Sequence, residues 1–131
     1  MITNQSGIGR GLLTTQQVID QHTWLCQKLA SHNIEITGYR ICPHHPDEGC
    51  KCRKPKPYMI IDAAEEFKID LTESWMIGDK RSDVEAGFFA GCLTGYIETF
   101  DNPYQESWTI PPTLIGKDLY TVVNYIINEE R

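Results

Sequence analysis

The sequence has no apolar run that approaches the length of about twenty residues needed to cross a bilayer. Asn4, Gln5 and Ser6 interrupt any apolar core at its start, so we expect no signal peptide either. Internal repeats, low-complexity stretches and linker-like segments are also missing. With 131 residues, 40% hydrophobic and 23% charged, the composition predicts a soluble, cytoplasmic protein with one domain, residues 1–131.

Little positive charge is available for binding nucleic acid. The formal net charge is −6, whereas nucleic-acid binders usually present a basic face, so we expect no nucleic-acid partner. Cations that gather in an acidic protein indicate a small anionic ligand, and scattered, solvated lysines are the alternative. Seven of the twelve Lys and Arg residues fall in three short segments: Arg10, then Lys51, Arg53, Lys54 and Lys56, then Lys80 and Arg81.

Cysteine and histidine crowd into one short loop. The spacing is Cys42-x-His44 followed by Cys50-x-Cys52. In a chain without an export signal, this crowding is typical of metal binding rather than of disulfides. Zinc prefers four N or S ligands, and three thiolates with one imidazole would close its coordination, so we predict a structural zinc ion. His45 is the alternative to His44, and free thiols with a surface histidine are the alternative to a metal site.

Apolar periodicity predicts strands and helices that alternate along the chain. Thr14 or Thr15 caps the first helix, Ser82-Asp83-Val84-Glu85 forms a capping box, and Gly91 ends the helix that this box starts. The predicted elements are a glycine-rich loop at 3–11, helices at 15–31, from 57, from 82 and from 119, strands at 36–41, 74–77 and 93–97, and an irregular segment at 101–113. This order predicts an α/β fold with a mainly parallel sheet covered on both sides, and ligands beyond the carboxyl ends of its strands.

Three segments offer ligands for an anion or a hard cation. Thr3 to Gly7 has hydroxyls and backbone N–H groups that suit phosphoryl oxygens. Arg53 and Lys54 directly follow the cysteine-rich loop, where a structural ion would fix them; a solvated basic turn is the alternative. Asp79, at the tip of a predicted strand, is placed to bind Mg²⁺. Asp83 either steadies a nearby lysine or favours the helix N-terminus through the dipole.

Taken together, these segments resemble the haloacid dehalogenase (HAD) superfamily of phosphatases. They are most similar to its small zinc-containing branch, which includes heptose-bisphosphate phosphatase and histidinol-phosphate phosphatase. The resemblance implies a three-layer, Rossmann-like α/β fold with a parallel sheet and a zinc-binding loop at 42–52. The motifs that carry it are Thr3-Asn4-Gln5-Ser6-Gly7-Ile8-Gly9-Arg10-Gly11, Cys42-Pro43-His44-His45-Pro46 through Cys50-Lys51-Cys52-Arg53-Lys54-Pro55, and Gly78-Asp79-Lys80 with Asp83.

The resemblance also implies roles for individual residues. Thr3 would hydrogen-bond the transferring phosphoryl group, Lys54 would neutralise its charge, and Asp79 would hold Mg²⁺, with Asp83 in support. The implied substrate-binding residues are Thr3, Asn4, Gln5, Ser6, Arg53, Lys54 and Lys80, and the implied zinc ligands are Cys42, His44, Cys50 and Cys52.

One motif of this family does not occur in the sequence. Its nucleophilic aspartate and its general acid belong to an Asp-x-Asp-Gly-Thr motif at the end of the first strand, and none of the 131 residues matches it. We therefore expect the first strand to be missing from this chain. The isolated chain would then be poorly stable, or be completed by another chain or by a missing N-terminal segment.

The sequence leads to a main functional hypothesis and three alternatives. The main hypothesis is a Mg²⁺-dependent phosphatase that hydrolyses the phosphate monoester of a small phosphorylated sugar, because the Cys-Pro-His-His-Pro run is more similar to the heptose-bisphosphate enzymes. The alternatives are a histidinol-phosphate phosphatase, a non-catalytic relative that binds phosphorylated ligands, and a zinc-ribbon module for nucleic acid. The acidic balance and the Asp79 segment oppose the last of these.

Overall fold

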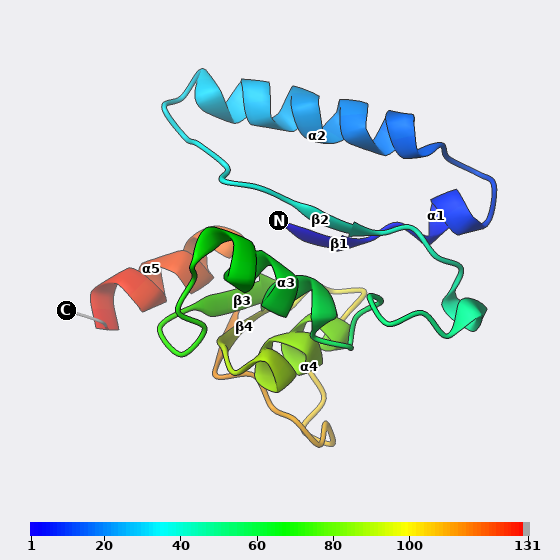
Figure 1. Ribbon diagram of the computed structural model, residues 1–131. Coiled ribbons are helices and arrows are strands. Elements are labelled where there is room, and N and C mark those ends of the chain that lie inside the picture. The colour runs from blue at the N-terminus through cyan, green and yellow to red at the C-terminus, as the bar shows by residue number, and fades with distance from the viewer. Residues whose placement is uncertain (130–131) are drawn as a thin grey trace. The chain divides into compact units, whose positions relative to one another are not determined.

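The computed structural model describes residues 1–129 and divides into two compact units, Met1–Arg53 and a second unit that begins at Lys54 (Figure 1). Each unit contains a parallel β-sheet and helices, so the predicted α/β class is confirmed. Among residues 1–129, no helix combines the length and the apolar character that a membrane span requires. The expectation of one domain over residues 1–131 stays a prediction.

The first unit is built on two short parallel strands. Thr3 pairs with Ile41 at the centre of the ladder, and the N–H of Gln5 donates to the carbonyl of Cys42 at 2.8 Å just beyond it. The elements are β1 (Ile2–Asn4), α1 (Ser6–Gly9), α2 (Thr15–Ala30), β2 (Arg40–Cys42) and the 3₁₀ turn η1 (Pro46–Glu48).

The long helix α2 begins as the sequence predicts. The Thr14 hydroxyl accepts from the N–H of Gln17 at 3.1 Å, and the Gln17 side chain accepts from the N–H of Thr14 at 2.8 Å. This reciprocal pair satisfies two of the N–H groups that a helix start leaves without partners. Thr14 is therefore the cap rather than Thr15, and Val18 on the next turn is completely buried.

Two predictions for the first unit are wrong in extent. The strand expected at 36–41 is limited to β2, and the expected loop at 3–11 contains β1 and the single turn α1. The reason is strand pairing. A strand forms only where another strand is hydrogen-bonded to it, and β1 has only three residues for β2 to pair with. The apolar residues before Arg40 have no such partner among the described strands.

The second unit is a parallel sheet in the order β3-β4-β5, with helices on both faces. Gly87 of α4 lies against Met76 and Thr94 on one face, and Val122 of α5 lies against Gly95 and Gly116 on the other. The elements are α3 (Tyr58–Phe67), β3 (Trp75–Gly78), α4 (Arg81–Ala90), β4 (Leu93–Ile97), β5 (Leu114–Gly116) and α5 (Leu119–Glu129). The predicted coverage of the sheet on both sides is therefore confirmed within this unit.

The boundaries in the second unit agree with the sequence at several points. β4 has the predicted bounds, and Gly91 ends α4 at φ +90°, a left-handed conformation that glycine adopts without strain. The cap of α4 is a correction: Lys80, not Ser82, is the N-cap, and its N–H donates to the Asp83 carboxylate at 3.1 Å. The strand β5 was not predicted, because only three residues of it are paired and proline-rich sequence precedes them.

A substitution at Gly87 tests how closely α4 packs on the sheet. A Cβ atom there would lie 2.6 Å from Cβ of Met76 and 2.8 Å from Cγ2 of Thr94. We expect Gly87→Ala to lower the free energy of unfolding by about 1–3 kcal/mol, measured by chemical denaturation, because the overlap outweighs the better helix propensity of alanine. Phe89→Ala, at an exposed position of the same helix, is the control and should change it by less than about 0.5 kcal/mol. A Gly87→Ala protein as stable as the parent would contradict this packing.

Candidate functional site

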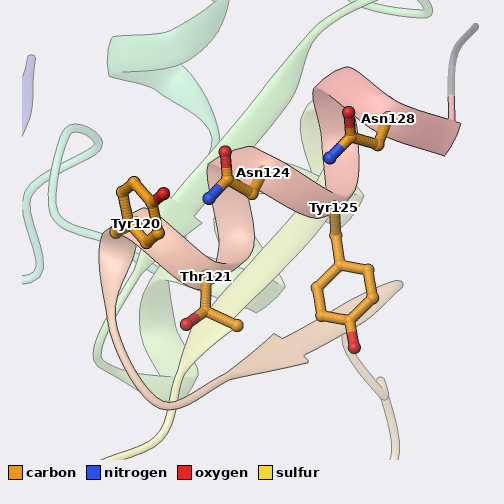
Figure 2. Close-up of a pocket in the computed structure, with 5 residues that line it drawn as sticks. All are labelled: Tyr120, Thr121, Asn124, Tyr125 and Asn128. Atoms are coloured by element: carbon orange, nitrogen blue, oxygen red, sulfur yellow. The ribbon is translucent and has the colours of Figure 1, made fainter.

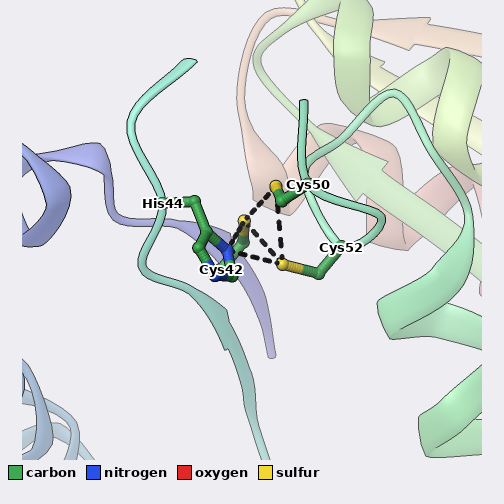
Figure 3. A group of neighbouring side chains, drawn as sticks. All are labelled: Cys42, His44, Cys50 and Cys52. Carbon is green, nitrogen blue, oxygen red and sulfur yellow. Dashed lines mark hydrogen bonds between the residues drawn. The ribbon is translucent and has the colours of Figure 1, made fainter. Parts of the chain in front are cut away.

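Four side chains of the first unit converge as the ligands of a metal ion would (Figure 3). The Sγ atoms of Cys42, Cys50 and Cys52 and Nδ1 of His44 all lie within 4.8 Å of one another. Sγ of Cys42 is 3.5 Å from that of Cys50 and 2.9 Å from that of Cys52, and His44 Nδ1 is 3.1 Å from Cys52 Sγ. Sulfur ligands of a tetrahedral ion with bonds of about 2.3 Å are about 3.8 Å apart. The donor set fits such an ion, while Sγ of Cys42 and Sγ of Cys52 lie closer together than bound ligands would.

The loop between the two ligand pairs is built by a short turn. Pro46 opens η1, and Gly49 follows it at φ +64°, where a side chain would be strained. Nδ1 of His45 accepts from the N–H of Asp47 at 3.1 Å, so His45 caps this turn. His44 and not His45 therefore lies in the cluster of candidate ligands.

The thiols of the cluster do not share one pKa. Burial raises the pKa of Cys52 to about 12, together with hydrogen bonds to Cys42 and Cys50. Burial also acts to raise the pKa of Cys50, but the N–H of Arg53 and the two neighbouring thiols outweigh it and lower this pKa to about 7. Adjacent thiolates would repel one another, so the closeness of the thiols opposes the build-up of negative charge in the cluster. A bound cation removes this conflict, since a coordinating thiol is deprotonated outright.

The segment Thr3–Gly9 packs directly on the metal loop. A Cβ atom on Gly9 would overlap the backbone of Pro43, His44 and His45, so only glycine allows this approach. The Gln5 amide donates to the Thr3 hydroxyl at 3.1 Å. The first unit thus holds Thr3, Asn4, Gln5 and Ser6, which the sequence predicted as substrate-binding residues, close to the cysteine loop.

Arg53 ends the first unit with an unusual feature. Its Nη1 atom is buried and has no hydrogen-bond partner among the described residues. Buried donors in proteins almost always have a partner, so a missing one indicates an absent acceptor. The backbone N–H of the same residue interacts with the Cys50 thiol, which ties Arg53 to the metal loop.

In the second unit, two predicted site residues meet across 29 positions of sequence. Nζ of Lys54 lies 2.5 Å from Oδ1 of Asp83, and the side chains are only 10% and 6% exposed. The other carboxylate oxygen of Asp83 accepts from the N–H of Lys80, and a Cβ atom on Gly78 would overlap this carboxylate. Both roles considered for Asp83, as partner of a lysine and as a group at the helix start, are therefore present. Asp79 lies directly after β3, exposed, as does Lys80.

Sequence reasoning missed a third contributor, the segment that follows β4. The side-chain amide of Asn102 donates to the backbone carbonyl of Asp79 at 2.8 Å, and the Tyr96 hydroxyl donates to the carbonyl of Asn102 at 2.6 Å. Burial raises the pKa of Tyr96, and the carboxylates of Asp79, Glu98 and Asp83 raise it further. The signal in the sequence was limited to two aromatic residues, Tyr104 and Trp108, in the proline-rich segment 101–113. This segment has no periodicity of apolar residues.

Comparison with known families decides the class of this protein. A family model described as HAD-hydrolase-like matches residues 51–122, more than half of the chain. The chain belongs to the HAD-like hydrolase family. The resemblance found in the sequence is thereby confirmed.

Three curated HAD-like relatives carry the name D-glycero-beta-D-manno-heptose-1,7-bisphosphate 7-phosphatase. The protein of Photorhabdus laumondii is 42% identical over 97 residues, which cover 69% of this chain and 52% of the relative. That of Yersinia pestis is 41% identical over 101 residues, 72% and 54% of the two chains. That of Vibrio cholerae is 32% identical over 138 residues, 100% of this chain and 74% of the relative. The chain thus matches about half the length of the first two relatives.

Solved structures of HAD-like proteins agree with this fold. The D,D-heptose 1,7-bisphosphate phosphatase of B. bronchiseptica, complexed with magnesium and phosphate, superimposes with a TM-score of 0.87 at 32% identity, over 98% of this chain and 73% of that one. A HAD-like phosphatase from Mesorhizobium loti gives a TM-score of 0.77 at 23% identity, over 96% of this chain and 63% of that one, and supports the fold alone.

A hollow on α5 lies away from the HAD-like motifs in the sequence (Figure 2). All of its lining residues come from this one helix, and none carries a cation for phosphate or a carboxylate for a metal. They are Tyr120, Thr121, Asn124, Tyr125 and Asn128. We therefore assign no chemistry to this hollow.

The metal cluster predicts different outcomes for the two adjacent histidines. Elemental analysis of the purified, reduced protein should find about one tightly held ion per chain, and His44→Ala should lose it because one of four ligands is gone. His45→Ala should keep the ion, because His45 only caps the neighbouring turn. Loss of metal from His45→Ala but not from His44→Ala would show that the ligand set is wrong.

Proposed function

We propose that the chain supplies the phosphate-binding and magnesium-binding residues of a phosphatase that removes the 7-phosphate of D-glycero-β-D-manno-heptose 1,7-bisphosphate. The observation that carries the proposal is the ion pair between Lys54 and Asp83, which lies next to the strand end that carries Asp79. The relatives that share this name support the substrate class. Histidinol phosphate is less favoured, because none of the relatives reported above is named for it.

Lys54 has the properties of a group that neutralises phosphoryl charge. Phosphoryl transfer depends mainly on positioning and on electrostatic stabilisation of the equatorial oxygens. A lysine side chain is normally mobile, but the contact with Asp83 at 2.5 Å fixes its ammonium group. An ammonium group has three donors, so a lysine can contact a carboxylate and a phosphoryl oxygen at the same time. Lys80, which follows Asp79 at the carboxyl end of β3, would contact the rest of the substrate.

Asp79 fits the role of a magnesium ligand. Mg²⁺ is usually bound through one or two carboxylates, with water and phosphate oxygens completing the octahedron, and Asp79 offers one exposed carboxylate at the carboxyl end of β3. When bound there, Mg²⁺ would supply positive charge to the phosphoryl oxygens. Another carboxylate of this region, Asp83, is paired with Lys54 and would orient it.

We also propose phosphate-binding residues in the first unit. The buried Nη1 of Arg53 has no partner among residues 1–129, and a phosphate oxygen is an acceptor that would satisfy it. Thr3, Asn4, Gln5 and Ser6 would add hydroxyl, amide and backbone donors from the segment that packs on the cysteine loop. The ion in that loop is proposed to be zinc, because three thiolates and an imidazole are a typical structural zinc site, and it would hold Arg53 through Cys50.

No residue of the printed sequence is assigned as the nucleophile, because no Asp-x-Asp-Gly-Thr motif occurs in it. A relative that binds sugar phosphates without turning them over stays the second prediction from the sequence. A cytoplasmic location and the lack of a nucleic-acid partner stay predictions from the sequence.

Reconstitution of activity separates the two candidates. The chain is joined to a segment that carries an Asp-x-Asp-Gly-Thr motif, and phosphate release from the heptose bisphosphate is measured with and without Mg²⁺. We expect Mg²⁺-dependent release that falls about 100-fold or more in Lys54→Met and in Asp79→Asn, as when one stabilising group is removed from an active site. Lys117→Met, an exposed lysine of the same unit, is the control and should keep full activity.

Two results would count against this proposal, one against catalysis and one against the metal role of Asp79. Binding of the bisphosphate without any turnover would favour the non-catalytic candidate. Full activity of Asp79→Asn would remove the proposed role of this residue in holding the metal.

A further inference from the structure

The segment Thr99–Trp108 is attached to the main chain of Asp79. Nδ2 of Asn102 donates to the carbonyl oxygen of Asp79 at 2.8 Å. This carbonyl lies at the carboxyl end of β3, beyond the ladder that pairs Trp75–Gly78 with β4. The ladder therefore does not fix the peptide that follows Asp79, and the Asn102 amide supplies a bond from outside the strand.

Asn102 is itself held from three directions. Its N–H donates to the carbonyl of Thr99 at 3.1 Å, and its carbonyl accepts from the N–H of Thr99 and from the Tyr96 hydroxyl. Tyr96 is completely buried at the centre of β4, so its hydroxyl is fixed by the core of the unit. The backbone of Asn102, from which the side-chain amide extends toward Asp79, is thus held by Thr99 and by Tyr96 of β4.

Aromatic packing holds the rest of the segment on the same strand. The ring of Trp108 lies 5.0 Å from that of Tyr96 and 5.2 Å from that of Tyr104, both edge to face. The N–H of Tyr104 donates to the Glu98 carboxylate at 2.9 Å, and the guanidinium of Arg81 lies 6.0 Å from the Trp108 ring. A segment without helix or strand is therefore ordered by contacts on both of its sides.

We propose that Asn102 is a positioning residue for Asp79, and that Tyr96 fixes it in that role. The proposal rests on the proposed function, in which Asp79 holds Mg²⁺. Asn102 does not touch the metal or the substrate; it fixes the backbone from which the Asp79 carboxylate extends. Groups that orient a metal ligand typically contribute about 10–100-fold to metal affinity or activity, because a looser ligand must be ordered on binding.

The test is a titration of the 131-residue chain with Mn²⁺, which replaces Mg²⁺ and is followed through the relaxation of water protons. Asp79→Asn defines binding without this ligand. We expect Asn102→Ala to weaken Mn²⁺ binding about 10-fold or more. Tyr96→Phe keeps the buried ring and removes only the hydroxyl, so it should weaken binding in the same direction by a smaller factor.

Gln105→Ala is the matched control, an exposed position in the same segment that should bind Mn²⁺ like the parent. Thermal unfolding of each variant shows that it is folded at the temperature of the titration. If Asn102→Ala and Tyr96→Phe bind Mn²⁺ like the parent while Asp79→Asn does not, the positioning role is overturned and the metal role of Asp79 survives. If the parent and Asp79→Asn bind Mn²⁺ equally, the metal role fails and the inference fails with it.

Discussion

The candidate site of the second unit depends on one ion pair, Lys54 with Asp83. The two charges are almost completely buried and 2.5 Å apart. Removing both charges from water is costly, so such a pair contributes little net stability, but the loss of one partner leaves an uncompensated buried charge. The pair therefore contributes more to the position of the Lys54 side chain than to the stability of the fold. It brings the residue that follows the cysteine loop in sequence to the start of α4, beside the strand end that carries Asp79.

A second electrostatic constraint shapes the first unit. Neighbouring thiolates of the cysteine loop would repel one another, and the raised pKa of Cys52, caused by burial and by its contacts with Cys42 and Cys50, reflects this constraint. Binding of an ion would convert this repulsion into cohesion of the loop. Gly9 packs on this cysteine loop, and Arg53 directly follows it in the sequence. The same ion would therefore fix the predicted phosphate-binding residues of this unit. Each unit thus uses charge compensation to hold cations or donors in place.

Local signals in the sequence were sufficient for several elements. The cap of α2 at Thr14 or Thr15, the terminal Gly91 and the apolar run of β4 depend on neighbours within four residues. Thr14 is the cap, and Gly91 and β4 were predicted correctly. The start of α4 was not, because Ser82-x-x-Glu85 has the pattern of a capping box, while the space left by Gly78 lets Asp83 reach both Lys54 and the N–H of Lys80. That choice depends on a residue 29 positions away, which no local pattern contains.

The spacing of the cysteines and the Gly78-Asp79-Lys80 motif also predicted the candidate site residues. They did not predict the tertiary contacts that hold these residues in place. Asn102 and Tyr96 reach Asp79 through tertiary contacts of a segment that has no periodicity. Its aromatic residues pack on β4, and the short strand β5 follows where the sequence suggested only irregular structure. The closeness of Asn102 and Tyr96 to Asp79 results from the parallel pairing of β3 with β4, which no local sequence pattern shows.

A double-mutant cycle on Lys54 and Asp83 tests the central ion pair most directly. The free energy of unfolding would be measured by chemical denaturation for the parent, Lys54→Met, Asp83→Asn and the double variant. The account predicts that the double variant is less destabilised than the sum of the single variants, with a coupling of about 1–3 kcal/mol, because each single change leaves a buried charge unpaired. Strict additivity would show that the two side chains do not interact, and would contradict the proposed arrangement of the site.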